Sequence, residues 1–206
     1  MSLLSIAGST PSDSGFELKS VRFDDGRNTK LKRTPGEEGD RRTFTISFWA
    51  KRGNSGTNNA RIFDARTGGT NEFDIIFNSS DQLWIYYFSG SYNLELKTTQ
   101  LFRDFAAWYH FVIAIDTKQV TSSNRAKVYV NGEQITAWAT ETYPAIDTQL
   151  PVNQSSSEHA IGNYGGSDSY DYDGYFAEWY SIDGRQLLPA SFGETNELTN
   201  QWQPKN

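Results

Sequence analysis

The sequence predicts an all-β protein, an antiparallel sandwich of two sheets. Short segments along most of the chain alternate apolar and polar residues with a period of two, and no segment shows a helical period. The composition agrees, because 13 Phe, 11 Tyr and 6 Trp favour strands while 17 Gly favour turns. A chain of 206 residues is long enough to bury one sizeable core between two such sheets.

The first half of the body supplies six expected strands. Residues 1–20 are Ser- and Gly-rich and are expected to form an arm or a weak first strand, with too few apolar residues to fold alone. The clearest strand is 43–51, and 83–88 is predicted to be central because it is apolar on both faces. Strands are expected at 21–23, 43–51, 61–64, 73–77, 83–88 and 94–96.

The second half continues the pattern. The run 108–116 is apolar on both faces, and Asn131-Gly132 predicts a tight hairpin turn because positive φ is easily reached there. Further strands are expected at 108–116, on both sides of that turn in 128–135, at 160–162 and at 173–182. We expect a polar loop over 140–158, single helical turns near 101–106 or 189–192, a body of 21–195 and a polar tail of 196–206.

Period-two alternation also predicts which side chains meet in the single core between the sheets. These are Phe44, Ile46, Phe48, Ile75, Phe77, Leu83, Ile85, Phe111, Ile113, Val128, Val130 and Phe176.

Charge and cysteine content exclude several classes of protein. With no cysteine, the chain has no disulfides, thiolate zinc sites or cysteine nucleophiles. The net charge of −6 argues against nucleic acid as a partner, and no segment predicts a signal peptide or membrane insertion. Residues 1–157 hold 17 acidic and 17 basic side chains, so the excess lies in 158–206, with 8 acidic and 2 basic. Two explanations of this asymmetry are open. The charges lie in solvated loops, or they form a basic face and an acidic face that meet between subunits.

Six short motifs, in this order, resemble the concanavalin A-like, laminin-G-like jelly-roll family. They are Val21-Arg22-Phe23, Thr45-Ile46-Ser47-Phe48-Trp49, Trp108-Tyr109-His110, Val128-Tyr129-Val130-Asn131-Gly132, Ile161-Gly162 and Gly174-Tyr175-Phe176-Ala177-Glu178. The resemblance implies a jelly-roll sandwich.

Two longer segments, 41–53 and 182–195, are similar to modules of structural proteins of tailed, particularly marine, bacteriophages. That similarity implies a non-enzymatic virion protein, in a capsid decoration, tail or fibre. Its partners would be other virion proteins and further copies of itself. The alternative is a lectin-like module that binds a host surface glycan.

Catalysis is the third alternative, as a glucanase-like hydrolase. Glucan-cleaving members of the family carry two carboxylates on one strand, spaced to face the same sugar. Glu72 and Asp74 have that spacing but are expected at a loop edge, and no Glu-x-Asp-x-x-Glu run exists. His110 is expected to be a packed structural residue and His159 a solvated one, so we expect no catalytic residues.

The stretch 163–175 is the expected ligand loop. It interleaves tyrosines with Gly, Ser and Asp, a mixture typical of binding loops. Tyr164 and Tyr175 are assigned to packing, which leaves Tyr170 and Tyr172, with Asp168 and Asp171, as the candidate glycan or receptor site. A subunit contact and an inert loop remain open as alternatives.

The resemblance also raises calcium as a metal, bound by loop oxygens. Asp171 and Asp173 are the candidate ligands, although the stretch fails the spacing of an EF-hand loop. A hydrated acidic loop is the alternative.

Overall fold

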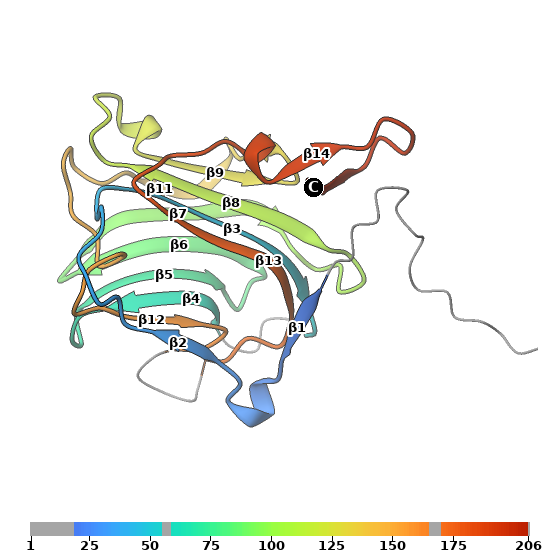
Figure 1. Ribbon diagram of the computed structural model, residues 1–206, viewed down its shortest axis with the longest axis horizontal. Coiled ribbons are helices and arrows are strands. Elements are labelled where there is room, and N and C mark those ends of the chain that lie inside the picture. Colours follow the sequence, from blue (N-terminus) through green and yellow to red (C-terminus); the bar gives the residue numbers. More distant parts are fainter. Residues whose placement is uncertain (1–18, 55–58, 165–169, 206) are drawn as a thin grey trace, which may run out of the picture.

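The computed structural model describes residues 19–54, 59–164 and 170–205, and it confirms the all-β architecture. Two large antiparallel sheets stack face to face, and a small two-stranded hairpin lies beside them (Figure 1). No helix in the described part of the chain is long and apolar enough to cross a membrane.

Six strands form sheet A. In spatial order they are β1 (Ser20–Phe23), β13 (Gly174–Asp183), β3 (Thr43–Arg52), β8 (Tyr109–Asp116), β9 (Ala126–Val130) and β10 (Glu133–Gln134).

Seven strands form sheet B. In spatial order they are β11 (Trp138–Thr142), β7 (Tyr92–Leu101), β6 (Gln82–Ser89), β5 (Asn71–Phe77), β4 (Ala60–Arg66), β12 (Glu158–Ile161) and β2 (Leu31–Arg33).

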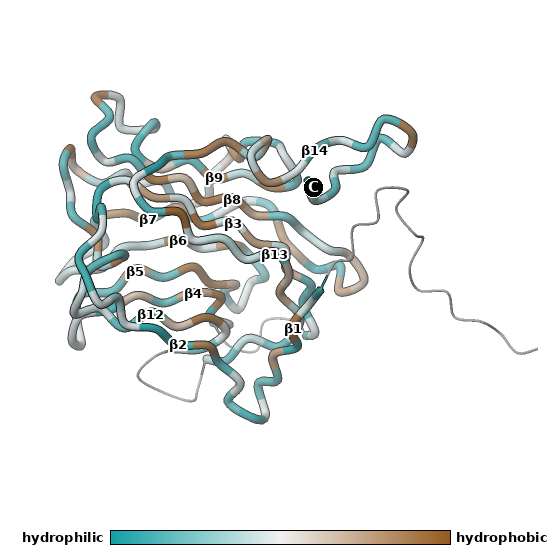
Figure 2. Tube along the Cα trace, in the orientation of Figure 1, coloured by the Kyte–Doolittle hydropathy of each residue, from teal (hydrophilic) through white to brown (hydrophobic). Residues whose placement is uncertain are grey.

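The core between the sheets contains all twelve residues that the alternation predicts, each less than a tenth exposed. Figure 2 shows the hydrophobic residues gathered along the strands of both sheets, with hydrophilic ones in the connecting turns. Aromatic rings tie the two sheets together: Phe44 of sheet A packs edge-on against Phe73 of sheet B, at 5.7 Å between ring centroids.

The expected single helical turn forms at Pro189–Ser191, one of the two places considered, and not at 101–106. Two other expectations about local structure are wrong. The loop expected over 140–158 is wrong at its start, because β11 extends to Thr142. This strand was not predicted, since few of its residues are apolar. The tail is not merely polar, since β14 (Gly193–Thr195) and β15 (Trp202–Pro204) pair as a hairpin.

A bulge in β13 changes the direction of its side chains. Glu178 has φ of +46°, and the pairing with β3 shifts between Ala177 and Tyr180. The extra residue lets Trp179 turn toward the core, where its ring stacks on Phe48 at 4.7 Å between centroids.

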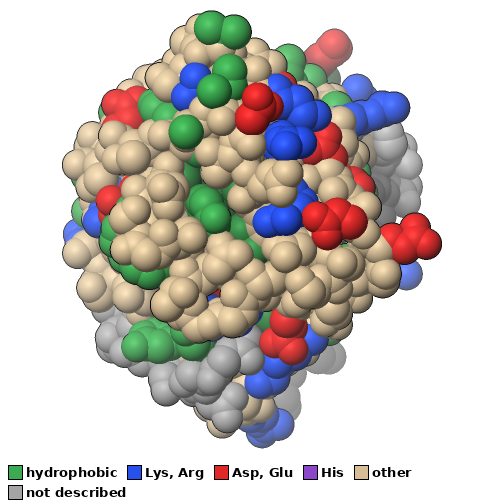
Figure 3. All heavy atoms as spheres, turned by 90° about the vertical axis from the view of Figure 1, so that its left-hand side faces the viewer, with side chains coloured by type: hydrophobic (Ala, Val, Ile, Leu, Met, Phe, Trp, Pro, Cys, Tyr) green, Lys and Arg blue, Asp and Glu red, His purple; other side chains and the backbone are tan. Residues whose placement is uncertain are grey.

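The charge asymmetry along the sequence is partly resolved within the fold. Pairing of β1 with β13 brings Arg22 to Asp173 at 2.5 Å, and pairing of β2 with β12 brings Lys32 to Glu158 at 2.8 Å. Both pairs join the basic N-terminal part to the acidic C-terminal part. Figure 3 shows basic and acidic side chains interspersed at the end of the sandwich that lies on the left of Figure 1. These contacts lie within one chain, so the asymmetry requires no second subunit.

Candidate functional site

The outer face of sheet B carries a cluster of aromatic and charged side chains. Strand register sets side by side the residues that point away from the core. One row across the strands is Asp64, Asp74, Tyr86 and Glu95, a second is Arg66, Glu72, Phe88 and Tyr92, and a third is Ile76, Trp84 and Lys97.

Four rings form an aromatic cluster on this face: Trp84, Tyr86, Phe88 and Tyr92. Tyr92 is at its centre, with ring centroids 5.2 Å from Phe88, 5.5 Å from Tyr86 and 5.7 Å from Trp84. Tyr92 is 43% exposed, so its ring is available to a ligand. Lys97 lies over the Trp84 ring at 4.4 Å and within 3.7 Å of Glu95.

An ion-pair layer lies beside the aromatic cluster, on β4 and β5. Arg66 donates two hydrogen bonds to Asp64, at 2.7 and 2.9 Å, and one to Glu72 at 3.0 Å. Arg61 donates to Asp74 at 2.8 Å and to the Tyr86 hydroxyl at 2.9 Å. Asp64 and Asp74 are fully buried although they point away from the core.

Burial and neighbouring charges together set the pKa values of this layer. Burial raises the pKa of Asp74 to about 7, with Asp64 and Glu72 adding to the rise and Arg61 opposing it. Burial opposes the charge of Arg66, but the hydrogen bonds and charge of Asp64 outweigh it and raise the pKa. Both guanidinium groups therefore remain charged.

Two tyrosines from the expected ligand loop cover the arginines. The Tyr164 ring lies 3.7 Å from the Arg66 guanidinium and 4.1 Å from that of Arg61. Tyr170 lies 5.1 Å from Arg61 and packs edge-on against Tyr164. A backbone hydrogen bond from Arg61 to the Tyr170 carbonyl, at 2.9 Å, anchors this loop to β4.

The structure separates the predicted ligand residues. Tyr170 is 36% exposed and adjoins the outer face of sheet B, as a binding residue requires. Tyr172 is 1% exposed and stacks on Phe176 at 4.2 Å, so it belongs to the core and not to a binding surface. Tyr164 packs, as expected, through cation–π contacts with two arginines. Asp168 lies outside the described residues.

The two predicted calcium ligands lie in separate contacts. Asp173 forms its ion pair with Arg22. Asp171 accepts a hydrogen bond from the Asn163 amide, which also donates to Asn28 at 2.7 Å. Within the described ranges, the acidic group whose oxygens come close enough to share a metal is Asp64, Glu72 and Asp74. Because Arg61 and Arg66 already neutralise two charges of this trio, its residues do not fit a calcium ion.

Residues considered for catalysis are also held in structural contacts. Glu72 and Asp74 lie on β5 and not at a loop edge, but both bind arginines and Asp74 has no exposed surface. His110 is buried, as predicted. His159 is half-buried and not solvated: its Nε2 accepts from the Asn153 amide at 3.1 Å, and Nδ1 contacts the Ser157 carbonyl at 3.0 Å.

The sequence reasoning missed the aromatic cluster. It treated the strand aromatics as core, because Leu83 to Phe88 are apolar on both faces and that pattern predicts a strand buried on both sides. One signal was available: Trp84, Tyr86 and Phe88 recur with a period of two, which places three rings on the same face of the strand.

Comparison with known proteins agrees with the fold. The family model described as the concanavalin A-like lectin/glucanases superfamily matches residues 25–183. A search of curated protein sequences found no match.

Several solved structures share the fold at low sequence identity. Domain 4 of the arabinanase AbnA from Geobacillus stearothermophilus, in complex with arabinotriose, aligns with a TM-score of 0.58 at 16% identity, covering 85% of this chain and 79% of that one. Mouse laminin α1 domains LG4-5 align with a TM-score of 0.57 at 14% identity, covering 82% of this chain and 42% of that one. The sialidase CBM40 domain of Ruminococcus gnavus, bound to α2,3-sialyllactose, aligns with a TM-score of 0.52 at 13% identity. The alignment covers 79% of this chain and 91% of that one. On the extent of the family match, and with the same two-sheet architecture, the chain belongs to the concanavalin A-like lectin/glucanase superfamily.

Proposed function

We propose that this protein is a non-catalytic carbohydrate-binding domain whose ligand lies on the outer face of sheet B. The observation that carries the proposal is the exposed Tyr92 ring at the centre of the four-ring aromatic cluster. An aromatic face stacks on the apolar face of a sugar ring, and neighbouring polar groups bind its hydroxyls. The family's description as lectins and glucanases supports this assignment.

The site is rigid, as recognition of a sugar requires. Its rings stand on two adjacent strands near the middle of a seven-stranded sheet, so the backbone already holds them in place before a ligand arrives. Glu95 and Lys97 on β7 point to the same side as the rings and supply an acceptor and a donor for hydroxyl groups.

The charges on this face favour an uncharged glycan. Each of its three cations already faces a carboxylate: Arg61 binds Asp74, Arg66 binds Asp64 and Glu72, and Lys97 is near Glu95. An anionic sugar would have to displace one of these carboxylates, which costs free energy that a neutral sugar does not lose. We therefore expect neutral polysaccharides to bind better than sialylated or uronate-containing ones.

The absence of catalysis is part of the proposal. A glycosidase needs two carboxyl groups in contact with the substrate, one protonated and one ionised. Glu72 and Asp74 differ in burial as such a pair should, but Asp74 is fully buried behind its contact with Arg61. We expect no reducing sugar to be released from any polysaccharide that the protein binds, and its release would contradict this part of the proposal.

Two tyrosines of similar exposure make a matched experiment. Tyr92→Ala should lower glycan binding at least tenfold on a glycan array and in titration calorimetry. Tyr180→Ala, which removes a ring of 39% exposure from sheet A, should leave binding unchanged. The proposal fails if both variants bind as the wild type does, or if both lose binding equally.

We further propose that the domain works on the surface of a bacteriophage particle, attached to other virion proteins and to copies of itself. Support comes from the similarity of residues 41–53 and 182–195 to phage structural modules. Mass spectrometry of purified particles and a cryo-EM map test this location. Adsorption of particles carrying Tyr92→Ala tests whether glycan binding serves attachment to the host.

A further inference from the structure

One side of the sandwich is open, between the edge strands of the two sheets. Among the described residues, β1 pairs with β13 alone and β2 with β12 alone, so each has one edge without a described neighbouring strand. β1 and β2 follow one another in the chain and border the same opening (Figure 1). Exposed strand edges are usually covered in stable proteins, because they otherwise pair with foreign strands.

A slot runs between these edges, which we call the open-side slot. It consists of two adjoining hollows that share Leu31 and Ile161. One hollow extends along β13 past Phe176 and Trp179, and the other, of about 360 Å³, reaches Asp183. From Phe176 to Asp183 a strand extends roughly 23 Å, which is long enough for an extended peptide of about seven residues.

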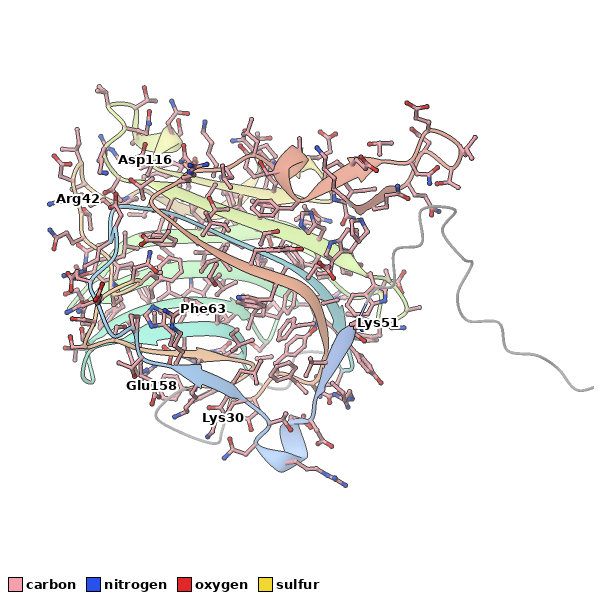
Figure 4. The ribbon with its side chains drawn as sticks, in the orientation of Figure 1. Lys30, Arg42, Lys51, Phe63, Asp116 and Glu158 are labelled. Carbon is pink, nitrogen blue, oxygen red and sulfur yellow. The ribbon has the colours of Figure 1, made fainter. Side chains whose placement is uncertain are left out.

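The smaller hollow is lined mainly by apolar side chains, some of them left exposed by the described residues, whereas charged and polar side chains line much of the larger one. Val21 is 51% exposed and Leu31 54%, although both line the slot between the sheets. Phe63 forms its floor and lies between β13 and β12 in Figure 4. Trp179, turned inward by the bulge at Glu178, forms part of the wall.

The sequence offers an occupant of matching chemistry. Residues 1–18 precede the described part of the chain, which begins at Lys19. Lys19 itself lines the slot. Leu3-Leu4-Ser5-Ile6 is a short apolar run, and residues 8–15 are Gly, Ser, Thr, Pro and Asp, which favour a reversal of the chain. Twelve residues separate Ile6 from Lys19 and span up to about 40 Å when extended, so length does not prevent the run from returning to the slot.

We propose that the chain's own N-terminal run, residues 3–6, docks in the open-side slot as an extended segment against Leu31 and Trp179. Docking would cover the exposed apolar wall and add a strand beside a free edge, the mode by which sheets commonly bind extended peptides. The N-terminal segment would thereby complete the sandwich of its own chain.

The absence of cysteine makes a direct test possible. Cysteines are introduced in pairs, with Leu3→Cys, Leu4→Cys or Ile6→Cys each combined with Leu31→Cys. A disulfide requires the two Cα atoms to approach within about 7 Å. The matched control combines each N-terminal cysteine with Val120→Cys, at an 84%-exposed position between β8 and β9. Mild oxidation, non-reducing electrophoresis and peptide mass mapping follow the products.

We expect at least one Leu31 pair to form an intramolecular disulfide at least tenfold faster than its Val120 control. Equal rates for every pair, or no bond at all, would overturn the proposal. A bond that joins two chains would also overturn it and would assign the slot to the arm of a neighbouring copy. Because Leu31 is more than half exposed, its replacement by Cys should leave the fold intact.

A second measurement is independent of cysteine chemistry. Deletion of residues 1–18 should shift tryptophan emission to the red, because Trp179 would lose its cover. A synthetic peptide of residues 1–18 should reverse the shift, whereas a peptide of scrambled order should not. Emission that is unchanged by the deletion would count against docking.

Discussion

The indole N–H of Trp202 donates to Nδ1 of His110 at 2.9 Å, although the two residues are 92 positions apart. Because Nδ1 accepts this bond, the neutral ring carries its proton on Nε2, which is 2.9 Å from the Ser47 hydroxyl. Trp49 stacks on the same imidazole at 4.9 Å. This contact fixes the C-terminal hairpin, residues 193–204, on the outer face of sheet A.

Acid should loosen this contact. Burial lowers the pKa of His110 to about 4 from an ordinary value of 6.5. The unfolded chain therefore takes up the proton first as pH falls, and stability present above pH 6.5 is lost toward pH 4, by about 3 kcal/mol for this residue. Burial also lowers the pKa of His159, which adds a loss of the same sign.

His110→Gln isolates that effect. Asp74, with its pKa raised to about 7, changes stability in the opposite direction with pH, so wild type alone does not report His110. Urea unfolding at intervals from pH 4 to pH 7.5 should show a smaller loss of stability at low pH in His110→Gln than in wild type. Parallel curves would contradict the assignment.

Removing the indole N–H should weaken the hairpin without removing its packing. Trp202→Phe should lower the free energy of unfolding by about 1 kcal/mol, the usual effect of one lost hydrogen bond. Leu198→Ala is the control, because Leu198 is in the same hairpin and is 92% exposed. Equal stability of both variants, measured by urea titration, would show that the bond contributes nothing.

The buried ion pair should be sensitive to the loss of one partner. Arg61→Ala leaves Asp74 buried without its counter-charge, and we expect a loss of about 3–5 kcal/mol in unfolding free energy. Arg103→Ala removes a 62%-exposed partner of Asp81 and should cost under about 1 kcal/mol. Adding Asp74→Asn to Arg61→Ala should recover part of the loss, and no recovery would refute a charge-based cause.

Calcium should not stabilise the protein. The acidic trio of the ion-pair layer is held by two arginines, and Asp173 is paired with Arg22. We expect the same midpoint of thermal unfolding in millimolar calcium and in chelator, measured by circular dichroism. A rise in the midpoint that disappears in Asp171→Asn would instead place calcium at the loop that the sequence suggested.

The local sequence pattern was sufficient to predict the sandwich and the residues of its core. Alternation places Phe44, Ile46 and Phe48 on the buried side of β3 whichever strands become their neighbours, because side chains in a strand point to opposite faces in turn. The Asn131-Gly132 turn, with φ of +49° and +88°, follows equally from local chemistry. The open side of the sandwich did not follow, because β2 is three exposed residues long and has almost no pattern of its own.

The sequence by itself determined which residues are apolar, how they alternate and where the chain turns, and those properties are local. Only the tertiary structure decided that Tyr172 is core while Tyr170 is surface, because Tyr172 stacks on Phe176 and Tyr170 lies over Arg61. It also decided that Trp84 and Tyr92 form one cluster on an outer face, and that Trp202 reaches His110. Those relationships join residues from different strands, and strand pairing between distant segments is set by the burial of the whole core and not by any one segment.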